Sequence, residues 1–194
     1  MLFFNVKERE DNKPAPKKEE KETETLSLKL KEMILNSSYE SEDIIFLCIG
    51  SDRCVGDSLG PLAGTMLKEQ QVPYRVYGTL EEPVHAFNLK GVLKDIKKLE
   101  NHPLIFSINA SLGEKDQVGS IVLKNGPIIP GKALEKVLPE AGAYHINGIV
   151  NYIDPLLSAQ FQNDTRLYTV MNLANRIVKM ITETVNHEQK LRNL

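Results

Sequence analysis

The sequence of 194 residues lacks tryptophan, has only two cysteines, and carries a formal net charge of only −2. Cys48 and Cys54 match neither a zinc motif nor a disulfide framework, so we expect two reduced thiols. The near-neutral charge argues against nucleic acid and against a membrane surface as partners. No apolar run approaches the ~20 residues that cross a bilayer, and the apolar opening of the chain is too short for a signal peptide. We therefore expect a soluble, cytoplasmic protein.

The amino-terminal stretch differs in composition from the rest of the chain. Residues 7–24 contain 13 charged residues among 18, six basic and seven acidic, together with two prolines. Such a stretch buries too little apolar surface to offset the entropy lost on ordering it. The sequence therefore predicts a disordered charged tail over residues 1–23 and a single domain over residues 24–194.

Apolar runs alternate with amphipathic segments through that domain. Strands are expected at 44–49, 75–80, 104–109 and 118–123, with a further apolar stretch at 144–150, and helices at 25–35, 58–70, 86–99, 132–137, 155–161 and 165–185. This alternation favours a largely parallel sheet that is covered on both faces. The loop before strand 118–123 is too short for a helical crossover, so this strand should run antiparallel to a neighbour. The predicted fold is a three-layer α/β structure with a mixed, mostly parallel sheet.

Three loops follow expected strands, and ligands of open α/β sheets usually bind there. The first loop, residues 50–61, is rich in glycine, and Asp57 would stand at the N-cap of the next helix. This loop lacks the phosphate-binding spacings, and Asp52 and Asp57 would repel a phosphate. The other two loops carry Asn109 and His145, each of which also has an ordinary structural explanation. Polar residues of the last helix, including Arg176, are expected on a solvated face.

The loop signals gain weight in combination. The segments concerned are CIGSDRCVGDSLGP (48–61), GTLEEPVHAFNL (78–89), NASLG (109–113), VGSI (118–121) and HINGIVN (145–151). Together they resemble the YyaC family of sporulation proteins, which is similar to the spore germination protease and, more distantly, to the hydrogenase maturation endopeptidases. The resemblance implies a phosphorylase/hydrolase-like fold and a carboxylate pair at the ends of the first and third main strands. Asp57 matches the first carboxylate and Asn109 stands at the second, while His145 matches the third residue around the metal of the maturation endopeptidases.

The amide at position 109 changes what such a site can do. Two carboxylates that share a proton can act as base and acid, whereas an amide neither takes nor gives that proton. In a peptidase, Asp57 would be the general base for water, Asn109 would polarise the substrate carbonyl or position the water, and His145 would assist at the rim. One carboxylate and one imidazole are a poor set for nickel or zinc, so we expect no metal and no other cofactor.

The sequence therefore predicts a sporulation-associated peptidase with catalysis impaired by Asn109, acting on a protein or peptide in the sporulating cell or spore. A catalytically inactive, protease-like protein that binds a peptide or partner protein is the alternative, and a metal-dependent endopeptidase is a third. An acidic turn before the helix at 86–99 would explain Glu82 without a binding role. The residues expected to contact substrate are Ser51, Asp52, Gly56, Glu81 and His85.

Overall fold

The computed structural model describes residues 16–99, 102–130, 138–152 and 165–192, which form a five-stranded sheet with helices around it. The strands are β1 (Ile44–Cys48), β2 (Arg75–Tyr77), β3 (Leu104–Gly113), β4 (Ile121–Asn125) and β5 (Tyr144–Tyr152), in the spatial order β2-β1-β3-β5-β4. All neighbours pair in parallel except β4, which is antiparallel to β5. The mixed, mostly parallel sheet predicted from the sequence is confirmed, including its antiparallel strand.

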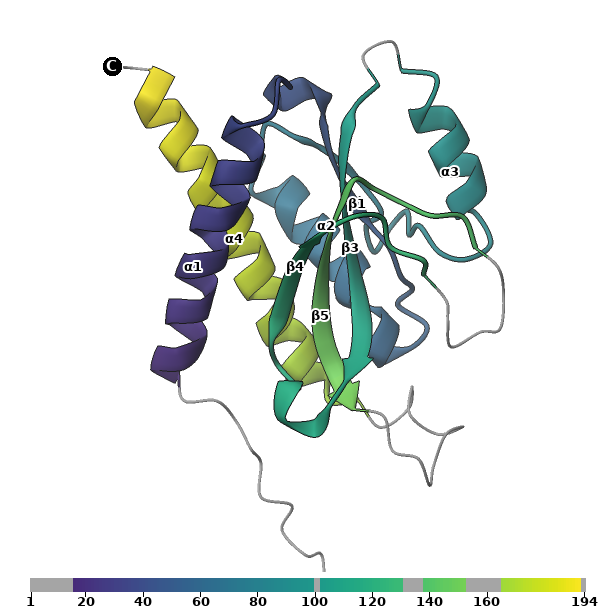
Figure 1. The fold of residues 1–194 in the computed structure, drawn as a ribbon. Helices are drawn as coiled ribbons and strands as arrows, with labels where there is room; N and C mark the ends of the chain where they lie inside the picture. The colour runs from purple at the N-terminus through teal and green to yellow at the C-terminus, as the bar shows by residue number, and fades with distance from the viewer. Residues whose placement is uncertain (1–15, 100–101, 131–137, 153–164, 193–194) are drawn as a thin grey trace, which may run out of the picture.

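Helices cover both faces of this sheet (Figure 1). They are α1 (Pro16–Leu35), α2 (Leu59–Glu69), α3 (Leu89–Ile96) and α4 (Leu167–Arg192), with short 3-10 turns η1 (Ser41–Asp43), η2 (Val55–Asp57) and η3 (Lys115–Gln117). The apolar sides of α1, α2 and α4 share a core with Phe46, Phe106 and Ile146, which point to one face. α3 packs on the opposite face against Ile45 and Leu47. The three-layer α/β prediction is therefore confirmed.

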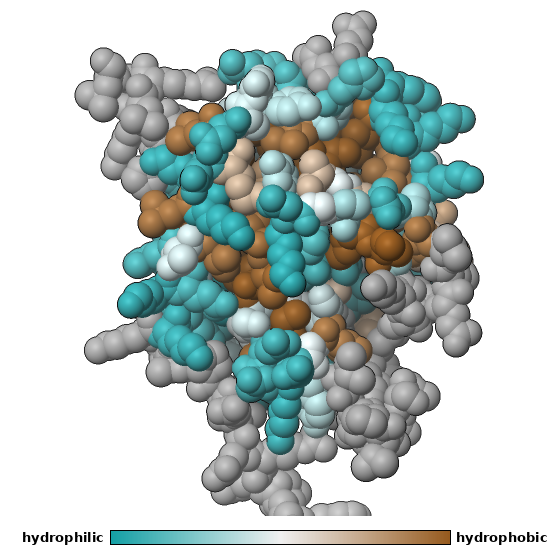
Figure 2. All heavy atoms as spheres, in the orientation of Figure 1, coloured by the Kyte–Doolittle hydropathy of each residue, from teal (hydrophilic) through white to brown (hydrophobic). Residues whose placement is uncertain are grey.

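The core sits around β1, all of whose residues are buried, as expected for a strand covered on both faces. Aromatic rings extend the core across the sheet. The ring of Phe46 lies 5.2 Å from that of Tyr74 and 5.5 Å from that of Phe106, which stacks in turn on Tyr144 at 4.9 Å. On the surface seen in Figure 2, hydrophilic side chains interrupt the hydrophobic atoms that remain exposed.

The predicted charged tail is wrong over residues 16–23, because α1 already begins at Pro16. Thr23 is 1% exposed, and Ser27, Leu30 and Ile34 are buried at helical spacing after it. The helix packs along α4 (Figure 1), and Arg176 of α4 is buried against it rather than solvated as predicted. The charged residues that suggested a disordered tail therefore lie on the outer side of α1 or pair with α4, as Glu22 does with Arg176. The first 15 residues of the predicted tail lie outside the described residues.

Other boundaries shift by a few residues. β4 begins three residues later than the expected strand, and α3 is shorter than the expected helix at 86–99. The short helices expected at 132–137 and 155–161 lie outside the described residues. Within the described part of the chain, every helix is too short or too polar to span a membrane.

Candidate active site at the carboxyl edge of the sheet

The loops that follow β1 and β2 leave the sheet side by side, next to β3. Just beyond β1, the Ile49 N–H donates to the Ile108 carbonyl of β3 at 2.7 Å, so this pairing extends one residue past the strand. The next residue turns away, because the Gly50 N–H donates to the Val84 carbonyl at 2.8 Å. Ile49 and Val84 also form a parallel bridge. The first and second segments singled out in the sequence therefore meet at the carboxyl end of β1.

Two glycines let the first loop fold back onto the end of β1. Gly50 has φ +149°, and a Cβ there would lie 2.1 Å from the main-chain oxygen of Asp57. A Cβ on Gly60 would lie 2.2 Å from the Ile49 carbonyl oxygen. The Ser51 N–H closes the loop by donating to the Asp57 main-chain oxygen at 3.0 Å. Main-chain packing without side chains thus brings Asp57 next to the strand that the loop has just left.

The sequence predicted Asp57 as the N-cap of α2, but in the structure it is the last residue of η2. The cap position is occupied by Ser58, whose hydroxyl donates back to the Val55 carbonyl at 2.8 Å and does not cap the helix. Burial raises the pKa of the Asp57 carboxyl to about 6, against the opposing effect of the Ser51 backbone N–H. A carboxyl of this kind exchanges its proton near neutral pH.

Asn109 lies on β3, and η2 packs beside that strand. Its side chain is half-buried, and its Nδ2 donates to the carbonyl of the next residue, Ala110, at 2.6 Å. The main chain of Asp57 and the Asn109 position therefore reach the same edge of the sheet from segments far apart in sequence. That convergence is what a shared site requires.

Asn147, which was not among the residues predicted from the sequence, lies on β5 beside Asn109 of β3 in the parallel register of the two strands. Its Oδ1 atom is buried, and no hydrogen-bond donor reaches it from the described residues. A buried acceptor without a donor calls for an explanation, such as a water or a ligand. The sequence did contain a signal for Asn147. Residues two apart on a strand lie on the same face, and Asn147 is two residues after His145, which the sequence had singled out.

His145 lies one step further from the carboxyl edge than Asn147, about 6.6 Å along the strand. Its neighbours in the sheet are Ser107 on β3 and Lys124 on β4. The ring Nδ1 lies 2.9 Å from the Gly126 carbonyl oxygen. Because a carbonyl only accepts, Nδ1 carries the proton in this contact and Nε2 is left with the lone pair of the neutral ring. The rim role expected for His145 would have to use Nε2 and stays a prediction.

The other residues expected to contact substrate lie in the loops that follow β1 and β2. Glu81 and Asp52 are exposed, whereas Ser51, Gly56 and His85 are half-buried. The His85 N–H donates to Asn88 Oδ1 at 2.8 Å, and its Nδ1 lies 3.3 Å from the Phe87 N–H. α3 begins only at Leu89, so the acidic pair before it does not lie in its first turn.

A divalent metal does not fit the residues of this edge. Nickel and zinc sites in proteins usually have at least three side-chain ligands. Among the described residues, no three His, Cys, Asp or Glu side chains come together in a way that could hold an ion. The Nδ1 of His145 is already engaged with a carbonyl.

Comparisons with known proteins place this chain in a family. The chain is similar to two solved hydrogenase maturation proteases of Thermococcus kodakarensis, HybD and HycI, each at 16% identity and a TM-score of 0.43. The likeness covers 73% of this chain and 98% of HybD, and 79% of this chain and 98% of HycI. The uncharacterized protein YyaC of Bacillus subtilis is 42% identical over 176 residues, which are 89% of this chain and 85% of YyaC. The model of a family described as "protein of unknown function (DUF1256)" matches residues 15–180, and the chain belongs to this family.

Proposed function

We propose that the protein is a peptidase-like hydrolase of the germination-protease type, in which Asp57 is the general base and Asn109 limits the rate. One observation carries the proposal: a half-buried carboxyl, whose pKa is raised by burial to about 6, lies at the edge of the sheet where β1 ends and β3 continues. Keeping an ionisable carboxyl in a buried place destabilises the fold, and active sites are where proteins do so.

The reaction would use the ionised Asp57 above about pH 6. The carboxylate takes a proton from a water molecule as the water oxygen bonds to the carbonyl carbon of a peptide bond. The Asn109 Nδ2, released from Ala110, donates to the developing oxyanion. As the C–N bond breaks, Asp57 returns the proton to the leaving amine. Asn109 can donate a hydrogen bond but cannot transfer a proton. Asp57 must therefore act first as the base and then as the acid, so turnover should be slow.

The strand geometry favours a peptide in extended conformation as the substrate. The pairing of β1 with β3 ends with Cys48 opposite Ile108 and one further hydrogen bond from the Ile49 N–H to the Ile108 carbonyl, whereas β3 continues to Gly113. Beyond that point, no strand of the described chain pairs with the edge of β3 that faces β1. An extended peptide can add to such an edge through main-chain hydrogen bonds. We propose that a protein or peptide substrate binds there.

A second candidate function is binding of a peptide or partner protein without cleavage. The specific observation in its favour is the short hydrogen bond from Asn109 to Ala110, which gives the amide a structural task at the position of the second carboxylate. Under this alternative, the carboxyl edge would hold the peptide and release it intact. By the resemblance to sporulation proteins, both candidate functions belong in the cytoplasm of a sporulating cell or in the spore.

The test compares the parent protein with Asn109→Asp and Asp57→Asn on an unstructured protein substrate, with mass spectrometry to detect new termini. A second carboxyl that can donate a proton should raise the cleavage rate by about 10²-fold or more. Asp57→Asn should abolish cleavage, and the parent rate should rise as the pH passes through about 6. Asp116→Asn, an exposed change on η3, is the matched control.

The outcomes separate the two candidates. Cleavage by Asn109→Asp that Asp57→Asn removes supports the hydrolase. Intact peptide recovered in a complex with the parent, together with no cleavage by Asn109→Asp, supports the binding protein. If neither cleavage nor binding is found, or if Asp57→Asn cleaves as well as the parent, the proposed site is wrong.

A further inference from the structure

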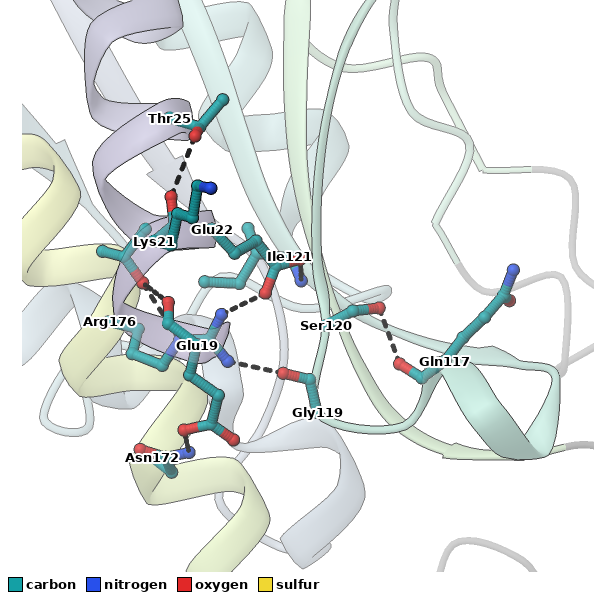
Figure 3. A network of polar contacts seen from close by, with 11 residues as sticks. Glu19, Lys21, Glu22, Thr25, Gln117, Gly119, Ser120, Ile121, Asn172 and Arg176 are labelled. Carbon is teal, nitrogen blue, oxygen red and sulfur yellow. Dashed lines mark hydrogen bonds and ion pairs between the residues drawn. The ribbon is translucent and has the colours of Figure 1, made fainter. Parts of the chain in front are cut away.

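The outer edge of β4 is covered by charged side chains of α1. β4 is the last strand of the sheet, so every second residue turns its N–H and C=O away from β5. The Ile121 N–H donates to Glu22 Oε1 at 3.4 Å (Figure 3). Two residues further along, the Leu123 carbonyl accepts from Lys29 Nζ at 3.0 Å. Both edge groups are thus satisfied by a helix instead of a strand.

The two side chains that bond to β4 come from one side of α1. Glu22 and Lys29 are seven residues apart, so they lie on the same side of α1, about 10 Å from each other along its axis. The acidic side chain meets a donor and the basic side chain meets an acceptor.

The amino-terminal part of α1 is fastened by Arg176 of α4 (Figure 3). The guanidinium pairs with Glu22 and donates to Thr23 Oγ1 at 3.1 Å and to the Gly119 carbonyl at 2.6 Å. Arg176 is only 7% exposed. Asn172, one turn before it on α4, donates to Glu19 at 3.0 Å. One buried cation therefore joins α1, α4 and the turn before β4, and Glu22 belongs both to this cluster and to the edge contact.

We infer that α1 is a cover that keeps the β4 edge from pairing with β4 of a second copy of this chain. β4 has the sequence Ile-Val-Leu-Lys-Asn, with three apolar residues, two of them β-branched, and one charge, and such an edge is open to strand pairing when it is bare. A second copy is the fitting partner because two identical edges related by a two-fold axis pair antiparallel, each N–H facing a carbonyl.

The experiment removes both edge contacts with Glu22→Ala and Lys29→Ala in the full chain, where alanine keeps the helix propensity high. The control replaces Glu24 and Lys31 by alanine, a pair that is also seven residues apart on α1 but has no bond to β4 in the structure. Hydrogen exchange of the 118–125 segment is followed by mass spectrometry, and mass in solution by light scattering, over a range of protein concentrations.

At low concentration, amide exchange in the 118–125 segment of the double variant should be about tenfold to a hundredfold faster than in the control. At high concentration a dimer should form, and the same amides should regain protection. A double variant that stays monomeric at every concentration overturns the inference, as does exchange that accelerates equally in β1 and α2. If the double variant does not fold, Lys29→Ala alone carries the same test at the Leu123 carbonyl, because it leaves the Arg176 cluster intact.

Discussion

The raised pKa of Asp57 makes a prediction about stability that is independent of any substrate. A carboxyl whose pKa is higher in the folded than in the unfolded state favours folding in its protonated form. This contribution is fully present below the ordinary value of 3.8 and is lost as the pH rises through about 6. Replacing Asp57 by the neutral, similarly shaped asparagine should therefore stabilise the protein at pH 7.5 and change little at pH 4.

The magnitude follows from the shift. A pKa raised from 3.8 to about 6 corresponds, at about 1.4 kcal/mol per unit, to an upper limit of about 3 kcal/mol. Water in contact with the unburied part of the carboxyl reduces this figure, so on the order of 2 kcal/mol is expected. In a chain of this size, that gain should raise Tm by about 4–8 °C.

Urea unfolding of the parent and of Asp57→Asn at pH 4, 5, 6 and 7.5 measures the effect. The difference in the free energy of unfolding should be near zero at pH 4 and should grow between pH 4 and pH 7. At pH 7.5 the midpoint should move by about 1 M urea. Asp52→Asn, on an exposed residue of the same loop, should change stability by less than about 0.5 kcal/mol. A variant that is less stable than the parent at pH 7.5, or a difference that does not depend on pH, refutes the reasoning.

Two further predictions concern packing. Gly60→Ala should lower the free energy of unfolding by more than about 3 kcal/mol, because the new Cβ would lie 2.2 Å from the Ile49 carbonyl oxygen. Gly91→Ala on α3, where the new Cβ has open space around it, should be neutral or should raise the free energy of unfolding by about 0.5–1 kcal/mol. Equal effects in thermal unfolding would contradict the backbone contact. Iodoacetamide should label Cys54 in the folded protein and leave Cys48 unlabelled, because burial both hides the Cys48 thiol and raises its pKa. Peptide mapping identifies the labelled cysteine. Rapid labelling of Cys48 in native conditions would show that β1 is not buried as described above.

The central elements could be predicted because their signals are local. The apolar run at 44–49 and the helical spacing at 58–70 reproduce β1 and α2 to within a residue or so. A strand buried on both faces has to be continuously apolar, and a helix on a sheet has to be amphipathic, so burial leaves its pattern in neighbouring residues.

Features that depend on distant partners could not be predicted in the same way. The amino-terminal half of α1 is bonded to Arg176, which pairs with a glutamate 154 residues earlier in the chain. The Asn109–Asn147 pair depends on which strands are neighbours and on their register, and a shift of one residue would turn Asn147 to the other face. Asp57 was found in the sequence, but its raised pKa results from burial by segments that the local pattern does not identify.

In the loop between Gly50 and Gly60, the contacts that fix its position are separate from the side chains that face solvent. Its attachment to β1 is made by main-chain atoms at both ends, whereas Asp52 and Arg53 in its middle are exposed to solvent. Side chains in the middle can therefore diversify during evolution, and so suit a different ligand, while the carboxylate keeps its place. Changes of ligand preference in this loop should therefore come from residues between Gly50 and Gly60, because neither glycine has room for a side chain.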